Sequence, residues 1–191
     1  MNTKIAIDVD EVLVHFLKPM AKWKGVELPK QPKYNYLYRE VFNCTEEESQ
    51  KILNEFYFSE DFKNLEPIKG SQFAMQNLNE VFDRMYIVTG RQEIVREPTE
   101  LWIEHFFPGV FHDVILTNSF TDNEIKKVDV CRALSIGCII DDSMSTCNEC
   151  IVGGIEALNF IGEETYPWCE VTKISVPGWG RGLKNQSVVD V

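Results

Sequence analysis

The sequence KIAIDVDEVL, at residues 4–13, decides the fold. It begins as an apolar run and ends in acids, which is typical of a buried β-strand whose carboxyl end reaches a ligand-binding edge. Side chains alternate along a strand, so Asp8 and Asp10 point to the same side. Two close carboxylates repel each other unless a cation or a proton lies between them. A polar turn after the strand would give the same pattern, so the other strands must decide between a turn and a metal site.

Four further apolar runs break into polar or small residues in the same way, at residues 85–88, 114–116, 138–140 and 155–160. Helical spacing of apolar residues marks the intervening segments, and we expect helices at residues 73–82, 98–107, 125–134 and 144–152. Short apolar runs without strict alternation are typical of strands buried on both faces. The succession of strands and helices predicts an α/β fold with a mostly parallel sheet.

Residues 15–69 contain no clear buried strand and interrupt this succession. Thr45 and Glu48 have the spacing of a capping box that begins a helix. We therefore predict a core domain of residues 1–14 and 70–191, with a small helical cap subdomain at 15–69 that has its own core. The segment is rich in aromatic residues, most of which we expect to pack in that core. The candidates to line a pocket facing the sheet are Phe16, Trp23, Tyr36, Phe56, Tyr57 and Phe58.

Composition excludes several classes of protein. The 191 residues contain 30 acids against 19 Lys and Arg, a net charge of −11, whereas proteins that bind duplex nucleic acid need basic residues to neutralise phosphates. No stretch approaches the roughly 20 apolar residues of a membrane span, and the N-terminus does not have the pattern of a secretory signal. Six cysteines without an export signal are typical of reduced thiols, so we expect a cytoplasmic protein without a membrane partner.

Two features of the C-terminal half have a structural interpretation. Cys147 and Cys150 form a CxxC inside an expected helix, and no second pair of ligands completes a zinc site, so we interpret them as two thiols on one helix face. The glycine-containing tail after Ser175 is expected to be loosely ordered; its glycines are Gly178, Gly180 and Gly182.

Polar residues follow the later strands as well. The tripeptide TGR at residues 89–91 supplies a hydroxyl, a flexible backbone and a cation, and the N–H groups of a following helix favour an anion. Lys127 lies at the start of the helix before the fourth strand and can reach a phosphate. The acids at 141–142 end that strand; they either cap the next helix or, because desolvated acids need a cation, bind one.

Acids, Thr, Lys and acids in this order resemble the four motifs of the haloacid dehalogenase (HAD) superfamily of phosphotransferases. The matching segments are IAIDVDEV, YIVT, Lys127 and CIIDD, and the resemblance covers residues 3–13 and 70–162. It implies a Rossmann-like sheet. The segments DVDEVLVHF, EPIKG, IIDDSMSTCNEC and Tyr166-Pro167-Trp168 are similar to the 5′(3′)-deoxyribonucleotidase-like group, in which the insertion is a helical cap of the C1 type.

The resemblance implies a Mg²⁺-dependent phosphomonoesterase. Asp8 would be the nucleophile that forms an aspartyl-phosphate, and Asp10 the general acid and then the general base. The implied Mg²⁺ ligands are Asp8, the Asp10 carbonyl, Asp142, and Asp141 directly or through water. The implied phosphate-binding residues are Thr89, Gly90 and Lys127, with Arg91 either adding a contact or pairing with a surface acid.

Several alternatives remain open at this point. Lys126 could fill the third motif in place of Lys127, and Glu11 stands where many superfamily members have Gly, so it could narrow the site. The expected substrate is a small phosphate monoester, a nucleoside monophosphate in the first place, because aromatic side chains stack on bases. The rival functions are a phosphatase for another monoester such as a sugar phosphate, a catalytically silent HAD-like binding domain, and a C–halogen hydrolase, which would not need the acids at 141–142. A homodimer is possible.

Overall fold

Strand β1 (Lys4–Ile7) lies in the middle of a six-stranded sheet in a computed structural model that describes residues 3–29 and 33–180. The strand order is β3-β2-β1-β4-β5-β6, and every pair is parallel. The other strands are β2 (Arg84–Thr89), β3 (Asp113–Leu116), β4 (Cys138–Asp141), β5 (Glu156–Phe160) and β6 (Ser175–Val176). The predicted α/β fold with a parallel sheet is therefore confirmed.

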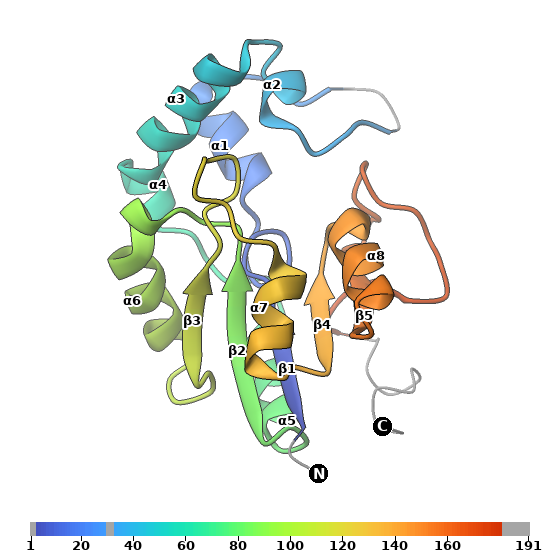
Figure 1. Ribbon diagram of the computed structural model, residues 1–191. Helices are drawn as coiled ribbons and strands as arrows, with labels where there is room; N and C mark the ends of the chain where they lie inside the picture. Colours follow the sequence, from blue (N-terminus) through green and yellow to red (C-terminus); the bar gives the residue numbers. More distant parts are fainter. Residues whose placement is uncertain (1–2, 30–32, 181–191) are drawn as a thin grey trace.

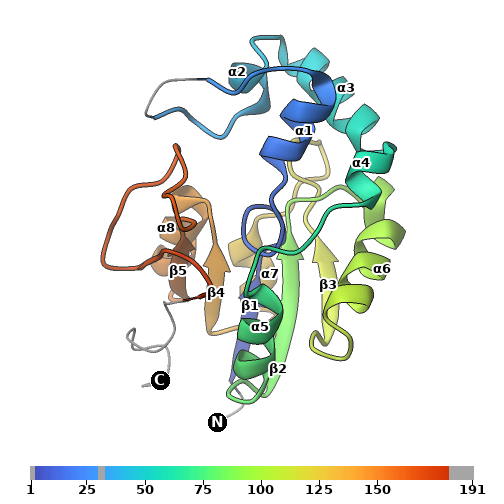
Figure 2. The ribbon, with the colours of Figure 1, turned by 180° about the vertical axis from the view of Figure 1, so that it is seen from behind.

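Alternating side chains divide the core into two layers. Ile5 and Ile7 belong to a cluster with α5 (Ser71–Asn79) and α6 (Arg96–Phe106), which follows the short 3-10 helix η1 (Glu93–Val95). Ala6 belongs to a second cluster with the helices α7 (Lys127–Leu134) and α8 (Met144–Val152). Figure 1 shows α7 and α8 in front of the sheet, and Figure 2 shows α5 on the opposite side. Burial on both faces explains why the strands are apolar runs without alternation.

The segment between β1 and α5 forms short helices above the carboxyl ends of the strands (Figure 1). They are α1 (Leu17–Lys24), α2 (Tyr38–Val41), α3 (Glu46–Tyr57) and α4 (Glu60–Lys63). The predicted capping box begins α3, because the Glu48 amide donates to Thr45 Oγ1 at 3.2 Å and the Thr45 amide donates to Glu48 Oε2 at 2.9 Å. The expectation that this segment has its own core is corrected: its apolar residues form one continuous cluster with the α5 and α6 face of the sheet.

Residues 175–180 are held in place, which corrects the expectation of a loosely ordered tail. β6 pairs with β5, and the Trp179 ring stacks on Phe160 with ring centroids 4.8 Å apart. The Trp179 indole also donates a hydrogen bond of 2.7 Å to the carbonyl of Val12. Gly178 permits close packing here, because a Cβ would lie 2.8 Å from Glu163 Cγ. Gly182 lies outside the described residues.

We expect Trp179→Ala to lower the free energy of unfolding by ~3–5 kcal/mol, because it leaves a cavity beside Phe160 and an unpaired carbonyl on Val12. Urea unfolding followed by circular dichroism measures this loss. The matched control is Trp23→Ala, since Trp23 is only half-buried and should cost much less. Equal losses in the two variants would contradict the role assigned to Trp179.

All six cysteines are free, and Cys147 and Cys150 are buried on α8, as the helix-face interpretation predicts. Within residues 3–29 and 33–180, no helix combines the length and the apolar character needed to cross a membrane.

Candidate active site

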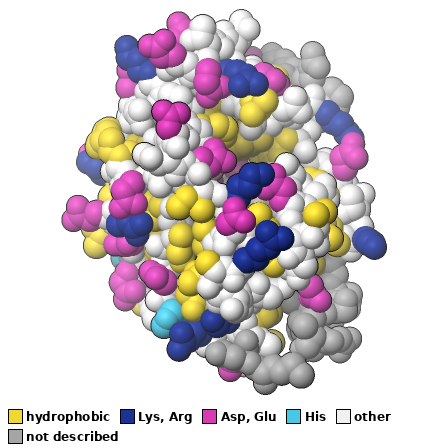
Figure 3. Space-filling view, viewed as in Figure 1, with side chains coloured by type: hydrophobic (Ala, Val, Ile, Leu, Met, Phe, Trp, Pro, Cys, Tyr) yellow, Lys and Arg dark blue, Asp and Glu magenta, His cyan; other side chains and the backbone are white. Residues whose placement is uncertain are grey.

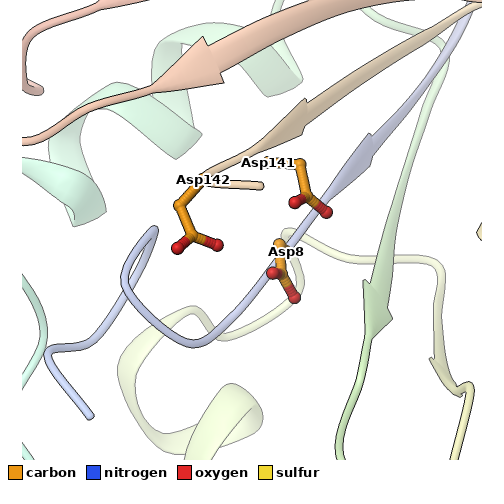
Figure 4. Close-up of side chains that lie close together, drawn as sticks. All are labelled: Asp8, Asp141 and Asp142. Atoms are coloured by element: carbon orange, nitrogen blue, oxygen red, sulfur yellow. The ribbon is translucent and has the colours of Figure 1, made fainter. Parts of the chain in front are cut away.

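Three carboxylates meet at the carboxyl edge of the sheet. Asp8 follows β1, and Asp141 and Asp142 end or follow β4, its parallel neighbour. One carboxylate oxygen from each lies within 4.8 Å of the others, and all three residues are buried (Figure 4). Because neighbouring parallel strands end side by side, two acidic motifs more than a hundred residues apart in the sequence share one site.

Lys127 is the cation that joins this cluster. Its Nζ lies 2.9 Å from Asp8 Oδ2 and 2.7 Å from Asp141 Oδ2. Burial alone would lower the pKa of the Lys127 ammonium, but Asp141 and Asp8 raise it above its usual value. Lys126 points elsewhere, because it is exposed and forms an ion pair of 3.2 Å with Glu149. Of the two lysines that the third motif left open, the structure therefore brings Lys127 to the acids.

The acids carry more negative charge than Lys127 can offset. Burial, helped by repulsion from Asp141 and opposed by Lys127, raises the pKa of Asp8 from 3.8 to about 7. Burial, followed by repulsion from Asp141 and Asp8, raises the pKa of Asp142 well above its usual value. Clustered carboxylate oxygens are the ligands that Mg²⁺ prefers, and a divalent cation would relieve this repulsion. The donor set therefore fits Mg²⁺.

In EDTA, we expect the free energy of unfolding to fall as the pH rises from about 4 to about 7. The pKa of Asp8 is raised on folding, so the folded state binds a proton more tightly than the unfolded state within this window. The contribution of that proton is complete below the unfolded pKa of 3.8 and is lost as the pH passes the folded pKa of about 7.

Urea unfolding of wild type and Asp8→Asn at about pH 4 and about pH 8 measures this effect, because effects of the surface acids cancel in the difference. The stability of wild type relative to Asp8→Asn should decline with pH in EDTA and decline less with Mg²⁺. A relative stability that rises with pH in EDTA would contradict the prediction.

Trp168 supports the acidic cluster from the loop after β5. Its indole N–H donates a hydrogen bond of 2.9 Å to Asp142 Oδ2. Its ring stacks on Tyr166 at 4.8 Å and contacts Tyr36 of the helical segment edge-on at 4.7 Å. Asn159 Nδ2 donates to the carbonyls of residues 141 and 142 at 3.1 and 2.9 Å, which fixes the backbone of the acidic pair. Sequence reasoning did not predict Trp168 as a site residue, although the Tyr-Pro-Trp segment was one of the features of the resemblance.

Asp10 lies at the same edge but pairs with Arg91 instead of joining the three clustered acids. Arg91 Nη2 donates to Asp10 Oδ1 at 2.7 Å, and the Arg91 side chain is only 2% exposed. The alternative that Arg91 pairs with a surface acid is therefore corrected, because its partner lines the site. Thr89, the last residue of β2, is fully buried, and its Oγ1 accepts a hydrogen bond of 3.4 Å from the Arg91 amide. Gly90 lines the cavity, where a Cβ would lie 3.0 Å from Ser119 Oγ.

Comparison with solved structures identifies this arrangement of elements. A hydrolase of the haloacid dehalogenase-like family from Streptococcus pneumoniae superposes with a TM-score of 0.61 at 15% identity, over 83% of this chain and 84% of that chain. The chain has a haloacid dehalogenase-like fold. A family IA, variant 3 HAD hydrolase from Entamoeba histolytica gives a TM-score of 0.61 at 13% identity, covering 98% of each chain. The HAD hydrolase YfnB from Bacillus subtilis, solved with magnesium, gives 0.60 at 16% identity, covering 99% of each chain.

Comparison of the sequence with protein families and with curated proteins identifies no relative. No family model matches the chain, and no curated protein matches it. The resemblance to the HAD superfamily that the four motifs indicated is confirmed at the level of the fold, where the solved neighbours are HAD hydrolases.

Glu11, the departure from the glycine found in many HAD proteins, turns away from the cavity. Its backbone has a φ of 63°, a left-handed conformation that glycine adopts most readily. Its carboxylate accepts hydrogen bonds from the amides of Phe16 and Leu17, at 3.0 and 2.7 Å, and so caps the start of α1. Glu11 does not line the cavity and does not narrow it, in contrast to the expectation from its size.

A cavity of about 660 Å³ lies between the acids of the HAD-like sheet and the helical segment. Two of the predicted aromatic candidates, Tyr36 and Tyr57, line it. The other candidates lie elsewhere: Phe16 and Phe56 are fully buried, Trp23 packs on Phe56 at 5.5 Å, and Phe58 is 62% exposed. The cavity also has lining residues that the sequence did not predict: Asn35, Leu53, Tyr38, Phe120 and Trp168.

The aromatic wall of the cavity is uncharged. Burial raises the pKa of the Tyr36 and Tyr38 hydroxyls well above the usual value, so both stay protonated. On the face that Figure 3 shows, Lys and Arg side chains lie among acids and form no continuous basic patch on the described surface. Within the site, Lys127 supplies positive charge as a single side chain, and a point charge of this kind suits a small anion.

Proposed function

We propose that this protein is a Mg²⁺-dependent phosphatase that hydrolyses small phosphate monoesters through an aspartyl-phosphate on Asp8. The observation that carries the proposal is the meeting of Asp8, Asp141, Asp142 and Lys127 at the carboxyl edge of a HAD-like sheet. A binding domain without catalysis has no need for buried acids that repel each other, because such a cluster costs stability.

Asp8, Asp141 and Asp142 are the residues that would hold Mg²⁺. A Mg²⁺ ion held there would offset the repulsion between the Asp8 carboxylate and the phosphate dianion of the substrate. Lys127 orients the Asp8 carboxylate by their 2.9 Å ion pair and supplies positive charge for the phosphoryl oxygens. The Gly90 amide, which lines the cavity, is proposed as a further donor to those oxygens, whereas Thr89 is fully buried and does not line the cavity.

The chemical work falls to Asp8 and Asp10. An oxygen of Asp8 attacks phosphorus and displaces the alcohol, to whose oxygen Asp10 gives a proton. Asp10 then takes a proton from water as the water oxygen attacks the aspartyl-phosphate and restores Asp8. Asp10 pairs with Arg91, whereas Asp8 lies among the clustered acids. The two carboxylates therefore have different surroundings, which supports different roles for them in the reaction.

For the substrate, we propose a nucleoside monophosphate, as in 5′-nucleotidases. Four aromatic residues line the cavity, namely Tyr36, Tyr38, Tyr57 and Trp168. Aromatic rings can stack on any nucleobase, because every base has a flat π-face. The volume of about 660 Å³ lies within the usual range for a small ligand. A sugar phosphate remains the second candidate, because the phosphate-binding part of the cavity would serve both.

A panel of deoxyribo- and ribonucleoside monophosphates and sugar phosphates tests the proposal, with release of inorganic phosphate measured in Mg²⁺ and in EDTA. We expect the fastest Mg²⁺-dependent release from a nucleotide. Faster release from a sugar phosphate would contradict the nucleotide assignment, and no release from any monoester would support the binding-domain alternative. Tyr57→Leu should raise KM for nucleotides but not for sugar phosphates, whereas Phe58→Leu, whose ring is exposed, should change neither.

The cellular location and the oligomeric state of the protein are proposed as well. We propose a cytoplasmic location, which the six free thiols support because they persist in a reducing compartment. The homodimer stays a prediction; light scattering of the purified protein measures its mass, and a monomer mass at micromolar concentration would contradict it.

A further inference from the structure

Arg91 lies in the wall of the cavity with its charge directed to a single acid. Its Nε lies 3.2 and 3.1 Å from Oδ1 and Oδ2 of Asp10, and its Nη2 lies 2.7 Å from Oδ1. No other side chain in the described part of the protein hydrogen-bonds to this carboxylate. A guanidinium that donates from two nitrogens to one carboxylate fixes both the position and the plane of the acid.

The Arg91 guanidinium also contacts side chains other than that of Asp10. Nη1 donates a hydrogen bond of 3.1 Å to the hydroxyl of Thr99 on α6. The guanidinium carbon lies 5.0 Å from the ring centroid of Phe62 on α4 and 6.0 Å from that of Phe16. The Arg91 guanidinium is therefore held by contacts with α6 and with the helical segment. A rotation of this side chain toward a phosphoryl group would break these contacts.

We infer that Arg91 is a positioning residue that holds the Asp10 carboxylate for proton transfer, and that it does not bind the phosphoryl group. The inference rests on the proposed function, and it differs from both roles that the sequence left open for Arg91. Lys127 differs in this respect, because it contacts the nucleophile Asp8 directly.

Both proton transfers depend on where Asp10 is held. In the first step, the Asp8–phosphorus bond forms, the phosphorus–oxygen bond to the alcohol breaks, and the proton of Asp10 passes to the alcohol oxygen. In the second step, the water oxygen bonds to phosphorus, the Asp8–phosphorus bond breaks, and a proton of water returns to Asp10. An Asp10 carboxylate without its guanidinium partner can rotate, and both steps lose the alignment that general catalysis needs.

The test is Arg91→Gln with two substrates that differ in the need for an acid. An alkyl phosphate needs a proton on its leaving oxygen, so kcat should fall by about 100-fold with little change in KM. Nitrophenyl phosphate releases nitrophenolate without that proton, so Asp8 is still phosphorylated quickly and only the water step is slow. Stopped-flow absorbance should then show a burst of nitrophenolate equal to the enzyme concentration, which a merely structural role would not produce.

Inorganic phosphate distinguishes the alternative role. If Arg91 binds phosphate, Arg91→Gln should weaken inhibition by inorganic phosphate at least tenfold and slow both substrates equally without a burst, which would overturn the inference. If Arg91 positions Asp10, inhibition by phosphate should be unchanged. Arg96→Gln is the charge-matched control, because Arg96 is partly exposed and pairs with Glu93 and Glu100.

Two further variants keep the test decisive. Arg91→Lys keeps the positive charge but cannot donate to Asp10 from two nitrogens. If Arg91→Gln fails to fold, Arg91→Lys should show the burst instead. No burst in Arg91→Lys would overturn the inference. Activity of wild type and its loss in Asp8→Asn are measured beside them. Failure of those two results would contradict the proposed phosphatase, whereas their success without a burst would contradict only the role of Arg91.

Discussion

Asp8→Asn should reduce phosphate release by about 10⁴–10⁶-fold while the protein remains folded. An amide cannot act as the nucleophile, so no phosphoenzyme forms and the first step stops. The fold should persist because Asn has nearly the same shape and because the buried carboxylate is itself destabilised, as the raised pKa of Asp8 indicates. Rapid acid quenching followed by intact-mass measurement should detect one added phosphoryl group in wild type and none in the variant.

The control for Asp8→Asn is Asp129→Asn on α7, an exposed acid that pairs loosely with Arg132 at 3.7 Å. It removes the same charge, but it should leave turnover and the phosphoenzyme unchanged. Substantial turnover in Asp8→Asn, with a native circular dichroism spectrum, would contradict a covalent mechanism at this residue.

Removal of divalent metal should reduce turnover by at least about 100-fold, and Mg²⁺ should restore it. Three buried carboxylates lie together, and Lys127 forms ion pairs with two of them, Asp8 and Asp141. A phosphate dianion would add further negative charge to the same space. Ca²⁺ should restore less activity, because it is larger and takes more ligands at longer distances than Mg²⁺. Phosphate release after dialysis against EDTA, with and without each ion, measures this dependence.

Metal binding itself can be measured without turnover. Asp142→Asn should weaken Mg²⁺ binding in calorimetry at least about tenfold, because it removes a proposed carboxylate ligand that accepts a hydrogen bond from Trp168. Asp122→Asn is the control, since Asp122 is exposed and lies outside the cluster. Equal turnover in EDTA and in Mg²⁺ would contradict the metal site, even if the three carboxylates do lie together.

Elements with strong local signals could be predicted from the sequence. The apolar runs placed five of the six strands to within a residue or two, and α8 begins and ends where the sequence predicts. Thr45 and Glu48 predicted the start of α3, because both hydrogen bonds of a capping box join residues three apart. The carboxyl ends of parallel strands lie at one edge of the sheet, so the acids of β1 and β4 could be expected to meet as well.

Contacts between distant segments could not be predicted. The pair of Arg91 with Asp10 joins residues 81 positions apart, and nothing near either residue in the sequence indicates the other. The strand β6 has two residues and exists only because β5 offers its edge. For Tyr57 and Phe58 a signal was present: Tyr57 continues the apolar face of α3, whereas Phe58 is the residue at which the helix ends, and only the former faces inward.

The hydrogen bond from Trp179 to the carbonyl of Val12 has a consequence for the order of events during synthesis. The ribosome makes residues 8–14, the loop that carries Asp8 and Asp10, early in synthesis, and a domain generally folds as a unit. The hydrogen bond from Trp179 to Val12 of this loop, however, can form only after a residue 167 positions later has been made. We therefore expect the nascent chain to be inactive until β6 has paired with β5. Activity should then appear abruptly near the end of synthesis and should not increase gradually with chain length.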